Sequence, residues 1–387
     1  MDFDLSDEQQ ATIDVAAKLL GDKATPDAIR AVEHADDLRF DRALWSAMAD
    51  AGLLGIAVPA EHGGAGLGVL ELCLVLEEVG RRTAPVPALA ALALGGLPVA
   101  RWGTAEQQAA LLPGLVAGTT VLTAALVEPL GDPARPTTTA RPDRGPSRGD
   151  DAAEGGAGWV LDGVRTNVPA GLVADTIIVP ATTDSGAVAL FLVPADAPGL
   201  ERERQDTTTG TPEARVRLDG VRVDQSAVLG PIDDGAALRW TLEHATAATC
   251  AVMAGLTAEA VRITGEYTTG REQFGRPIAT FQAVGQRAAD AYVDAHAVRL
   301  TMLQAAWRLG AGMPADREVA VAKYWAAAGG QRVVHAASHL HGGVGVDRDY
   351  PLHRYFLLAK QLELSLGGAS RQLLRLGGIL AAEGAQR

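Results

Sequence analysis

The 387-residue sequence predicts an α+β fold with a helical start, a sheet-rich middle and a longer helical end. Apolar residues recur at helical spacing up to about residue 125. Short runs of Val, Ile and Leu separated by Gly, Asp and Pro follow, and Ala-rich helical patterns begin near residue 234. We therefore predict an N-terminal helical domain (1–125), a barrel- or sandwich-like β-domain (126–232) and a C-terminal four-helix bundle (233–387).

The first region alternates helical patterns with short loops. LSDEQQATIDVAAKLLGD places Ser6 as a helix cap and has acidic residues in its first turn. ALWSAMADAGLLGI and VLELCLVLEEVGRRT repeat the helical pattern, with the glycine-rich loop VPAEHGGAGLG between them. The most apolar window, residues 84–100, is interrupted by prolines and glycines, so it predicts a buried helix or turn and not a membrane span.

The middle region predicts strands and one long loop. WVLDGV, DTIIVPAT, AVALFLV and ARVRLDGVRV are short β-branched runs bounded by turn residues. Residues 131–158 are polar and rich in Pro and Gly, and they cannot bury an apolar face, so we predict a mobile loop there.

The last region predicts the four helices of a bundle. The helical patterns cover residues 237–270, 280–310 and 317–341, and a shorter pattern covers residues 357–366. This order of elements is the basis for the predicted architecture.

The composition limits the function classes. Hydrophobic residues make up 48% and charged residues 21%, as in a globular protein with a sizeable core. The net charge of −13 argues against a nucleic-acid partner, because phosphate backbones attract clustered Lys and Arg, although one local basic pocket is compatible with it. MDFDLSDEQQ does not read as a secretory leader, so we expect a cytoplasmic protein without a membrane partner. Cys73 and Cys250 lie in apolar helical patterns, which predict buried free thiols.

The segment TGREQFGRPIATFQ, from Thr269 to Gln282, carries chemistry suited to a nucleotide. Arg271 can direct two N–H groups at phosphate oxygens, and Phe274 can lie against a ribose or a ring. Gln282 can hydrogen-bond a nucleotide edge or a ribityl oxygen. The alternative is a surface arginine at the junction between two helices.

REQFGRPIATFQ resembles a motif of the acyl-CoA dehydrogenase family of flavoproteins. Further segments resemble that family in the same order, namely VPAEHGGAGLG, ALVEPLGDP, WVLDGVRTNV, SAVLG and HLHGGVGVDRDYPLHRYFLLAK. The resemblance covers essentially the whole chain. It implies FAD as the cofactor, an acyl-CoA as the substrate and an electron-transfer flavoprotein as the electron acceptor. It also implies a glutamate that removes the α-proton while the β-hydrogen leaves as hydride to the flavin.

By this resemblance, six residues contact the ADP part of FAD: Arg271, Phe274, Gln282, His339, Gly342 and Gly343. The glycine pair allows close approach of the backbone to phosphate. His339 stands where the family usually has glutamine, and a neutral histidine can still donate one hydrogen bond. The neighbouring His335 and His341 suggest a metal site, but no carboxylate or cysteine accompanies the three histidines, so we predict no metal.

The residues that the resemblance places around the flavin ring depart from the family. Val127 replaces a threonine, and the serine of the usual Gly-Ser-Asp is absent after Leu130. Asn167 stands where an aromatic residue usually lies near the ring, and Pro169 shortly after it cannot donate a backbone hydrogen bond.

The catalytic glutamate of the family is also missing. The usual position, just before a Gly-Thr in the last helix, holds Leu366, and the position that a minority of members use in the first bundle helix holds Ala245. Neither side chain can accept a proton. Glu243 and Glu363 lie nearby in sequence and are open alternatives as displaced bases, although solvated helix-face carboxylates fit both positions.

The departures from the family fall in one half of the FAD site, which is the half that covers the flavin ring and supplies the base. In the family, each FAD lies at a subunit interface, and one chain covers the flavin while its neighbour holds the ADP. The sequence therefore predicts a non-catalytic subunit that completes the FAD site of a homologous partner, and it resembles the base-lacking subunit of α2β2 acyl-CoA dehydrogenases of actinobacterial steroid side-chain degradation. A self-sufficient homotetrameric dehydrogenase with a displaced base and a non-enzymatic acyl-CoA-binding or assembly scaffold stay open as alternatives.

Overall fold

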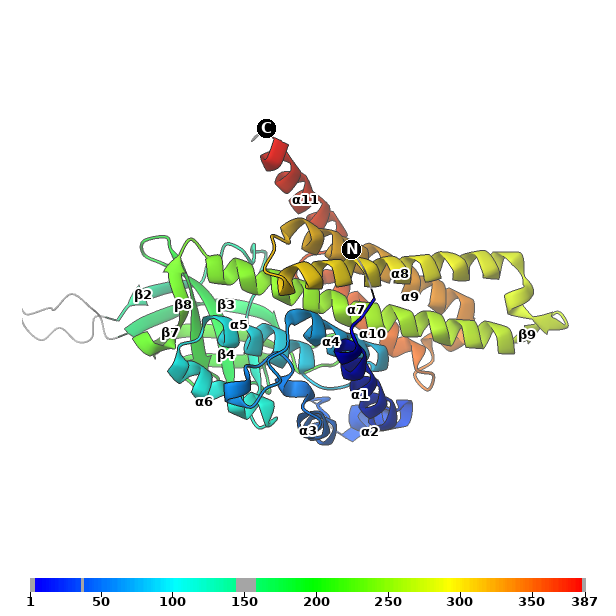
Figure 1. The fold of residues 1–387 in the computed structure, drawn as a ribbon, viewed down its shortest axis with the longest axis horizontal. Coiled ribbons are helices and arrows are strands. Elements are labelled where there is room, and N and C mark those ends of the chain that lie inside the picture. Colours follow the sequence, from blue (N-terminus) through cyan, green and yellow to red (C-terminus); the bar gives the residue numbers. More distant parts are fainter. Residues whose placement is uncertain (1–3, 36–37, 144–157, 385–387) are drawn as a thin grey trace, which may run out of the picture. The chain divides into compact units, whose positions relative to one another are not determined.

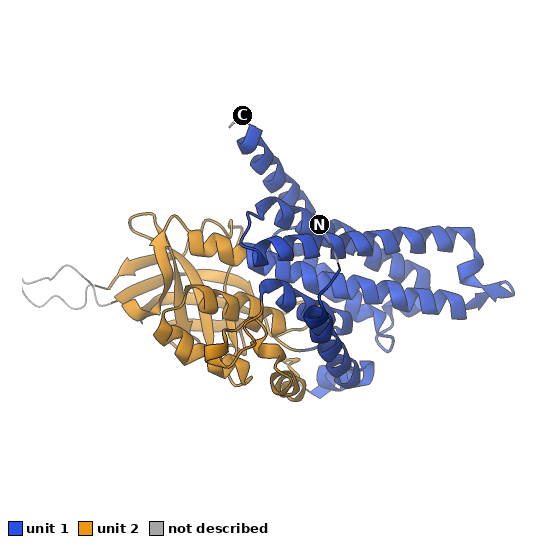
Figure 2. Cartoon of the chain, viewed as in Figure 1, with its two compact units in different colours: residues 1–35, 68–85, 243–387 blue, residues 36–67, 86–242 orange. Residues whose placement is uncertain are grey.

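The computed structural model describes residues 4–35, 38–143 and 158–384 (Figure 1). The chain forms two compact units, shown in different colours in Figure 2. The first unit contains Met1–Ala35, Gly68–Pro85 and Glu243–Arg387, and the second contains Asp36–Leu67 and Val86–Leu242. The helix–sheet–helix order along the chain confirms the predicted α+β class. The bounds of the three predicted domains stay predictions.

The first unit is helical. Its helices are α1 (Asp7–Lys23), α2 (Pro26–Ala35), α4 (Val69–Arg82), most of α7 (Ala236–Gly270), α8 (Gln282–Gly310), α9 (Asp316–His341), α10 (Leu352–Leu364) and α11 (Ala369–Gly384). A two-stranded hairpin, β9 (Glu272–Gln273) and β10 (Arg276–Pro277), lies between α7 and α8, and the short 3₁₀ helices η5 (Ile278–Thr280) and η6 (Gly342–Val346) precede α8 and follow α9.

Local sequence explains where these helices begin and how they pack. Ser6 caps α1 as predicted, because its hydroxyl accepts a hydrogen bond from the backbone N–H of Gln9 at 3.2 Å. Helices α4 and α7 approach closely at glycines: a Cβ atom added to Gly80 would lie 2.0 Å from the carbonyl oxygen of Val252. Cys73 and Cys250 are buried free thiols on these two helices, as predicted.

The second unit contains short helices and a sheet. The helices are α3 (Arg42–Asp50), η1 (Leu53–Gly55), η2 (Ala60–His62), η3 (Leu89–Gly96), α5 (Leu97–Trp102), α6 (Ala105–Val116) and η4 (Gln225–Ala227). The apolar window at residues 84–100 forms the buried π-helix η3 and the start of α5, which confirms the prediction of a buried helix.

Among the residues that the structure describes, the sheet of the second unit has eight strands. They are β1 (Leu122–Ala124), β2 (Thr139–Pro142), β3 (Gly158–Val168), β4 (Thr176–Thr183), β5 (Val188–Pro194), β6 (Leu200–Arg204), β7 (Ala214–Asp224) and β8 (Val228–Asp233). Their order is β6-β7-β3-β2-β4-β5-β8, with β1 paired in parallel to β4, so the described sheet is open and not a closed barrel. Most pairs are antiparallel, with Ile178 opposite Leu192 at the buried centre.

The prediction of a mobile loop at residues 131–158 is partly wrong. Residues Thr139–Pro142 form strand β2, which pairs antiparallel with β3 and parallel with β4. The pairing gives this polar segment backbone partners that its composition does not suggest, and tertiary contacts therefore override the local signal. Residues 144–157 of the predicted loop lie outside the described residues.

Candidate functional site

The hairpin after α7 presents the predicted nucleotide-contacting arginine. The N–H of Arg271 donates to the carbonyl oxygen of Tyr267 at 2.8 Å, and the N–H of Ile278 donates to the carbonyl oxygen of Arg271 at 2.8 Å. Phe274 and Gly275 turn the hairpin with φ angles of 54° and 76°. Positive φ is common for glycine and rare for phenylalanine, so the hairpin holds Phe274 in an unusual backbone conformation.

The side chains of this hairpin are exposed. Phe274 is 93% exposed, and its ring meets the ring of Phe281 edge to face at 6.1 Å. Arg271 is exposed, and its guanidinium forms no ion pair with the residues that the structure describes. Gln282 is exposed at the first position of α8. An exposed guanidinium and an exposed aromatic ring on the same hairpin are suited to an anionic ligand with a planar or sugar-like part.

The end of α9 carries the other predicted contacts. His339 is exposed in its last turn, and Gly342 ends the helix with φ at 60°. The N–H of Gly342 donates to the carbonyl oxygen of His339, so Gly343 is the candidate phosphate donor of the glycine pair. Apart from each glycine's chain neighbours, no atom of the described residues lies within 4 Å of a Cβ atom added to either glycine, and a ligand can therefore approach the backbone here.

The first unit brings these two elements together through aromatic rings. The ring of His341, next to Gly342, stacks on the ring of Tyr267 with centroids 4.3 Å apart. Tyr267 lies one helical turn before Arg271. The six predicted residues therefore all belong to one unit, in the hairpin, at the start of α8 and around the end of α9, while their contact with FAD stays a prediction.

The second unit contains the residues that the family resemblance places around the flavin ring. The N–H of Thr166 donates to the carbonyl oxygen of Val127 at 3.0 Å, so the turn after β1 lies beside the end of β3. Asn167 is exposed with φ at 49°, and its N–H donates to Oε1 of Gln205 at 2.6 Å. Leu130 is fully exposed with φ at 57°. No aromatic ring or threonine hydroxyl stands at these aligned positions.

The turn after β1 contains one partner of a buried ion pair, Glu128, and this pair was not predicted from the sequence. The carboxylate of Glu128 accepts four hydrogen bonds of 2.7–2.8 Å from the backbone N–H groups and hydroxyls of Thr137 and Thr138. It also lies 3.1 Å from the guanidinium of Arg165, whose side chain is fully buried. A charged residue at an inward position of a predicted strand was the available signal.

The ion pair is charged at neutral pH. Burial raises the pKa of Glu128, but the charge of Arg165 and the bonds from Thr137 lower it, and the net pKa is below its ordinary value. Burial lowers the pKa of Arg165 to about 10, partly offset by Glu128. The pair therefore fixes the turn at Val127–Gly131 electrostatically.

The two positions of the family's base carry no carboxylate. Leu366 is half-buried between α10 and α11 with φ at 56°, and Ala245 is fully buried in α7. The alternatives Glu243 and Glu363 form ion pairs, with Arg375 at 3.6 Å and Lys360 at 2.6 Å. Each of these two carboxylates is therefore engaged by a cation of this chain.

Neither a metal site nor a membrane-spanning helix is found among the described residues. Within residues 4–35, 38–143 and 158–384, no group of three or more His, Cys, Asp or Glu side chains is placed to hold a metal ion. Over the same residues, no helix combines the length and the apolar character that crossing a membrane requires.

The chain matches two family descriptions. Residues 6–119 match the acyl-CoA dehydrogenase N-terminal domain, and residues 233–377 match the acyl-CoA dehydrogenase C-terminal domain. The chain therefore belongs to the acyl-CoA dehydrogenase family.

Particular relatives align over nearly the whole chain. Acyl-CoA dehydrogenase FadE27 of Mycobacterium tuberculosis is 41% identical over 98% of this chain and 99% of its own length. FadE28 of the same organism is 34% identical over 97% of this chain and 98% of its own length.

Two solved structures are similar in fold and sequence. A variant of the Tcur3481-Tcur3483 steroid ACAD is 46% identical with a TM-score of 0.89, and it covers 98% of this chain and 99% of its own. The ChsE4-ChsE5 complex from Mycobacterium tuberculosis is 40% identical with a TM-score of 0.90 and the same coverage.

FAD is the cofactor of this family, and the two halves of the site fit it differently. The unpaired guanidinium of Arg271 and the open backbone at Gly343 fit the ADP part. The residues aligned with the flavin-ring contacts do not fit the ring, because Val127 and Asn167 supply neither a hydroxyl nor an aromatic face.

Proposed function

We propose that this chain is the non-catalytic subunit of an FAD-dependent acyl-CoA dehydrogenase complex and completes the FAD site of a homologous partner. The observation that carries the proposal is the half-buried Leu366 at the position of the family's base, with Ala245 at the minor position. A chain that cannot accept the α-proton depends on another subunit for that step.

The residues of this chain would bind and orient the cofactor. Arg271 would direct its fork at the pyrophosphate, Phe274 and Gln282 would contact the adenosine side, and Gly343 would offer a backbone N–H. FAD supplies a two-electron acceptor when bound. The partner's carboxylate would take the α-proton, and the two electrons would leave to an electron-transfer flavoprotein.

The relatives support the assembly and the substrate class. One solved relative is a complex named for two chains, ChsE4 and ChsE5, and another is named as a steroid ACAD with two chains. By analogy, we propose an α2β2 assembly and a steroid side-chain CoA thioester as the substrate. We place the complex in the cytoplasm, where a CoA thioester is available.

The surface of the first unit supports a protein partner. Large apolar side chains stand exposed on α8 and α11: Tyr292, Val293, Leu300, Trp307, Leu373 and Leu374. Helix α11, which carries the C-terminus in Figure 1, is tied to α9 by the ion pair of Glu383 with Arg317 at 3.3 Å. Gathered apolar side chains on exposed helices are typical of protein interfaces.

Purification of the chain alone and with a homologous chain encoded next to it tests the proposal. We expect the chain alone to be colourless and inactive, and the co-purified pair to be yellow and to oxidise acyl-CoA. A yellow, active protein from this chain alone would support the self-sufficient enzyme instead. A stable pair that never gains flavin or activity would support the scaffold alternative.

A further inference from the structure

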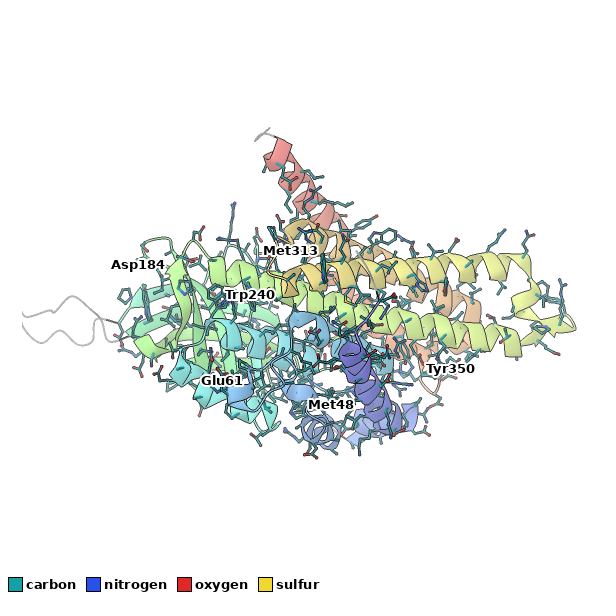
Figure 3. All side chains as sticks on the ribbon, in the orientation of Figure 1. Met48, Glu61, Asp184, Trp240, Met313 and Tyr350 are labelled. Carbon is teal, nitrogen blue, oxygen red and sulfur yellow. The ribbon has the colours of Figure 1, made fainter. Side chains whose placement is uncertain are left out.

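Three rings join the end of α7 to the end of α9, and we call them the His341 cluster (Tyr267, His341 and Tyr350). The rings of His341 and Tyr267 stack at 4.3 Å with 24° between their planes. The ring of Tyr350, labelled in Figure 3, lies 5.2 Å from His341 and 6.3 Å from Tyr267. All three residues belong to the first unit.

Two hydrogen bonds determine which ring nitrogen of His341 carries the hydrogen. Nδ1 of His341 lies 2.8 Å from the carbonyl oxygen of Ala337, which can only accept, so Nδ1 carries the hydrogen. Nε2 lies 3.2 Å from the hydroxyl of Tyr350 and accepts its hydrogen. Burial lowers the pKa of His341 and raises the pKa of Tyr350, which keeps this arrangement at neutral pH.

Each side of the cluster adjoins a predicted nucleotide contact. His341 directly precedes Gly342, and the carbonyl oxygen of Tyr267 accepts the N–H of Arg271 at 2.8 Å. The loop after the glycine pair folds back tightly, because a Cβ atom added to Gly345 would lie 2.8 Å from the carbonyl oxygen of Ser338. The cluster is therefore a packing contact between the end of α7 and the end of α9.

We infer that His341 is a positioning residue, which holds Arg271 and the Gly342–Gly343 backbone at the separation that one ADP group requires. The inference rests on the proposed function. His341 itself is buried and is not needed to touch the nucleotide. A ligand held from two elements binds well only when their spacing is fixed in advance.

FAD titration of the flavin-free pair tests this inference. Loss of a hydrogen bond and a ring contact in His341→Ala should weaken FAD binding about three- to tenfold. Tyr350→Phe keeps the ring and removes only the hydroxyl, so its effect should be smaller. The double variant should lose less FAD-binding free energy than the two single variants lose in sum, because the two residues act together. His335→Ala, at an exposed position of the same helix, is the matched control and should bind FAD normally.

The outcomes separate this inference from the proposed function. Normal FAD affinity in both His341→Ala and Tyr350→Phe pairs, with Arg271→Ala impaired, would overturn the positioning role and leave the proposed function standing. Normal affinity in Arg271→Ala as well would overturn both. If His341→Ala prevents assembly of the pair, Tyr350→Phe decides: weaker FAD binding supports the inference and unchanged binding overturns it.

Discussion

At the residue scale, the described part of the chain combines an arginine without an ion-pair partner with a leucine, Leu366, at the position where we predict the family's base. Arg271 stands exposed without an ion-pair partner in the described part of the chain, whereas Glu243 and Glu363 are each tied to a cation. An arginine without an internal partner keeps its charge available for a ligand. Substitutions of Arg271, Leu366 and Glu128 test the roles of these side chains.

Arg271→Ala should lower the flavin content of the co-purified pair. Losing a forked, charge-assisted contact of about 1.5–3 kcal/mol weakens binding by roughly 10- to 100-fold. Flavin absorbance per pair after gel filtration measures the effect. Arg215→Ala, which removes an exposed guanidinium from β7, is the control. Equal flavin content in the two variants would rule out Arg271 as a cofactor contact.

Leu366→Glu should leave the chain alone inactive. The substitution returns a carboxylate to the family's position, but Val127 and Asn167 still offer no flavin-ring contacts. The measurement is reduction of an artificial electron acceptor with acyl-CoA, with the co-purified pair as the positive control. Dehydrogenation by the single variant chain would mean that the base was its only missing part.

Glu128→Ala should destabilise the second unit by about 3–5 kcal/mol, because Arg165 then stays buried without its charge partner. Chemical denaturation measures the free energy of unfolding. Glu203→Ala is the control, since it breaks an exposed pair at 3.7 Å and should cost at most about 1 kcal/mol. Similar losses in both variants would contradict the role of the buried pair.

The same carboxylate predicts a pH dependence. The pKa of Glu128 is lower in the folded chain than its ordinary 4.5, so its contribution is complete above that value and is lost as the pH falls through the folded-state pKa. Glu128→Gln should therefore flatten the decline of stability below pH 4.5. An unchanged pH profile in the variant would show that other groups control acid unfolding.

The sequence predicted some of these residues and not others. Arg271 and Leu366 follow from local chemistry at recognisable positions, because each can be judged from its own side chain. The pairing of Glu128 with Arg165 joins residues that are distant in sequence, and the stacking of His341 on Tyr267 joins two separate helices. Such partners depend on tertiary packing, which one sequence does not reveal.

At the element scale, periodicity predicted the long helices well. The patterns at residues 237–270 and 317–341 correspond to α7 and α9 within a residue. Strand β2 and helix α11 were missed, because a Pro- and Thr-rich segment and a Gly377–Gly378 pair weaken the local signal. Glycine also determines how α4 and α7 pack.

Gly255→Ala should disrupt the contact between α4 and α7. An added Cβ atom would lie 1.7 Å from the carbonyl oxygen of Glu77, and such overpacking costs about 1–3 kcal/mol or more. Gly265→Ala on the same helix has no atom within 4 Å of the added Cβ and should gain about 0.5–1 kcal/mol from better helix propensity. Thermal unfolding compares the two, and equal shifts would contradict the close helix contact.

At the scale of the whole molecule, the two compact units contain different parts of the predicted FAD site. The first unit contains the arginine hairpin and the glycine pair that we predict to contact an ADP group, and the second unit contains Val127 and Asn167 at the predicted flavin-ring positions. Family membership and the helix–sheet–helix order were predictable from motifs in order along the chain. The identity of the partner was not, because it depends on a surface that has to match another chain.

A structure of the co-purified pair with bound FAD tests most directly which subunit contacts which part of the cofactor. We predict that Arg271 and Gly343 of this chain contact the pyrophosphate, while the isoalloxazine ring lies against the homologous subunit and faces that subunit's carboxylate. An isoalloxazine ring seated against this chain's own sheet, with Glu243 or Glu363 directed at the α-carbon of the acyl-CoA, would contradict the account.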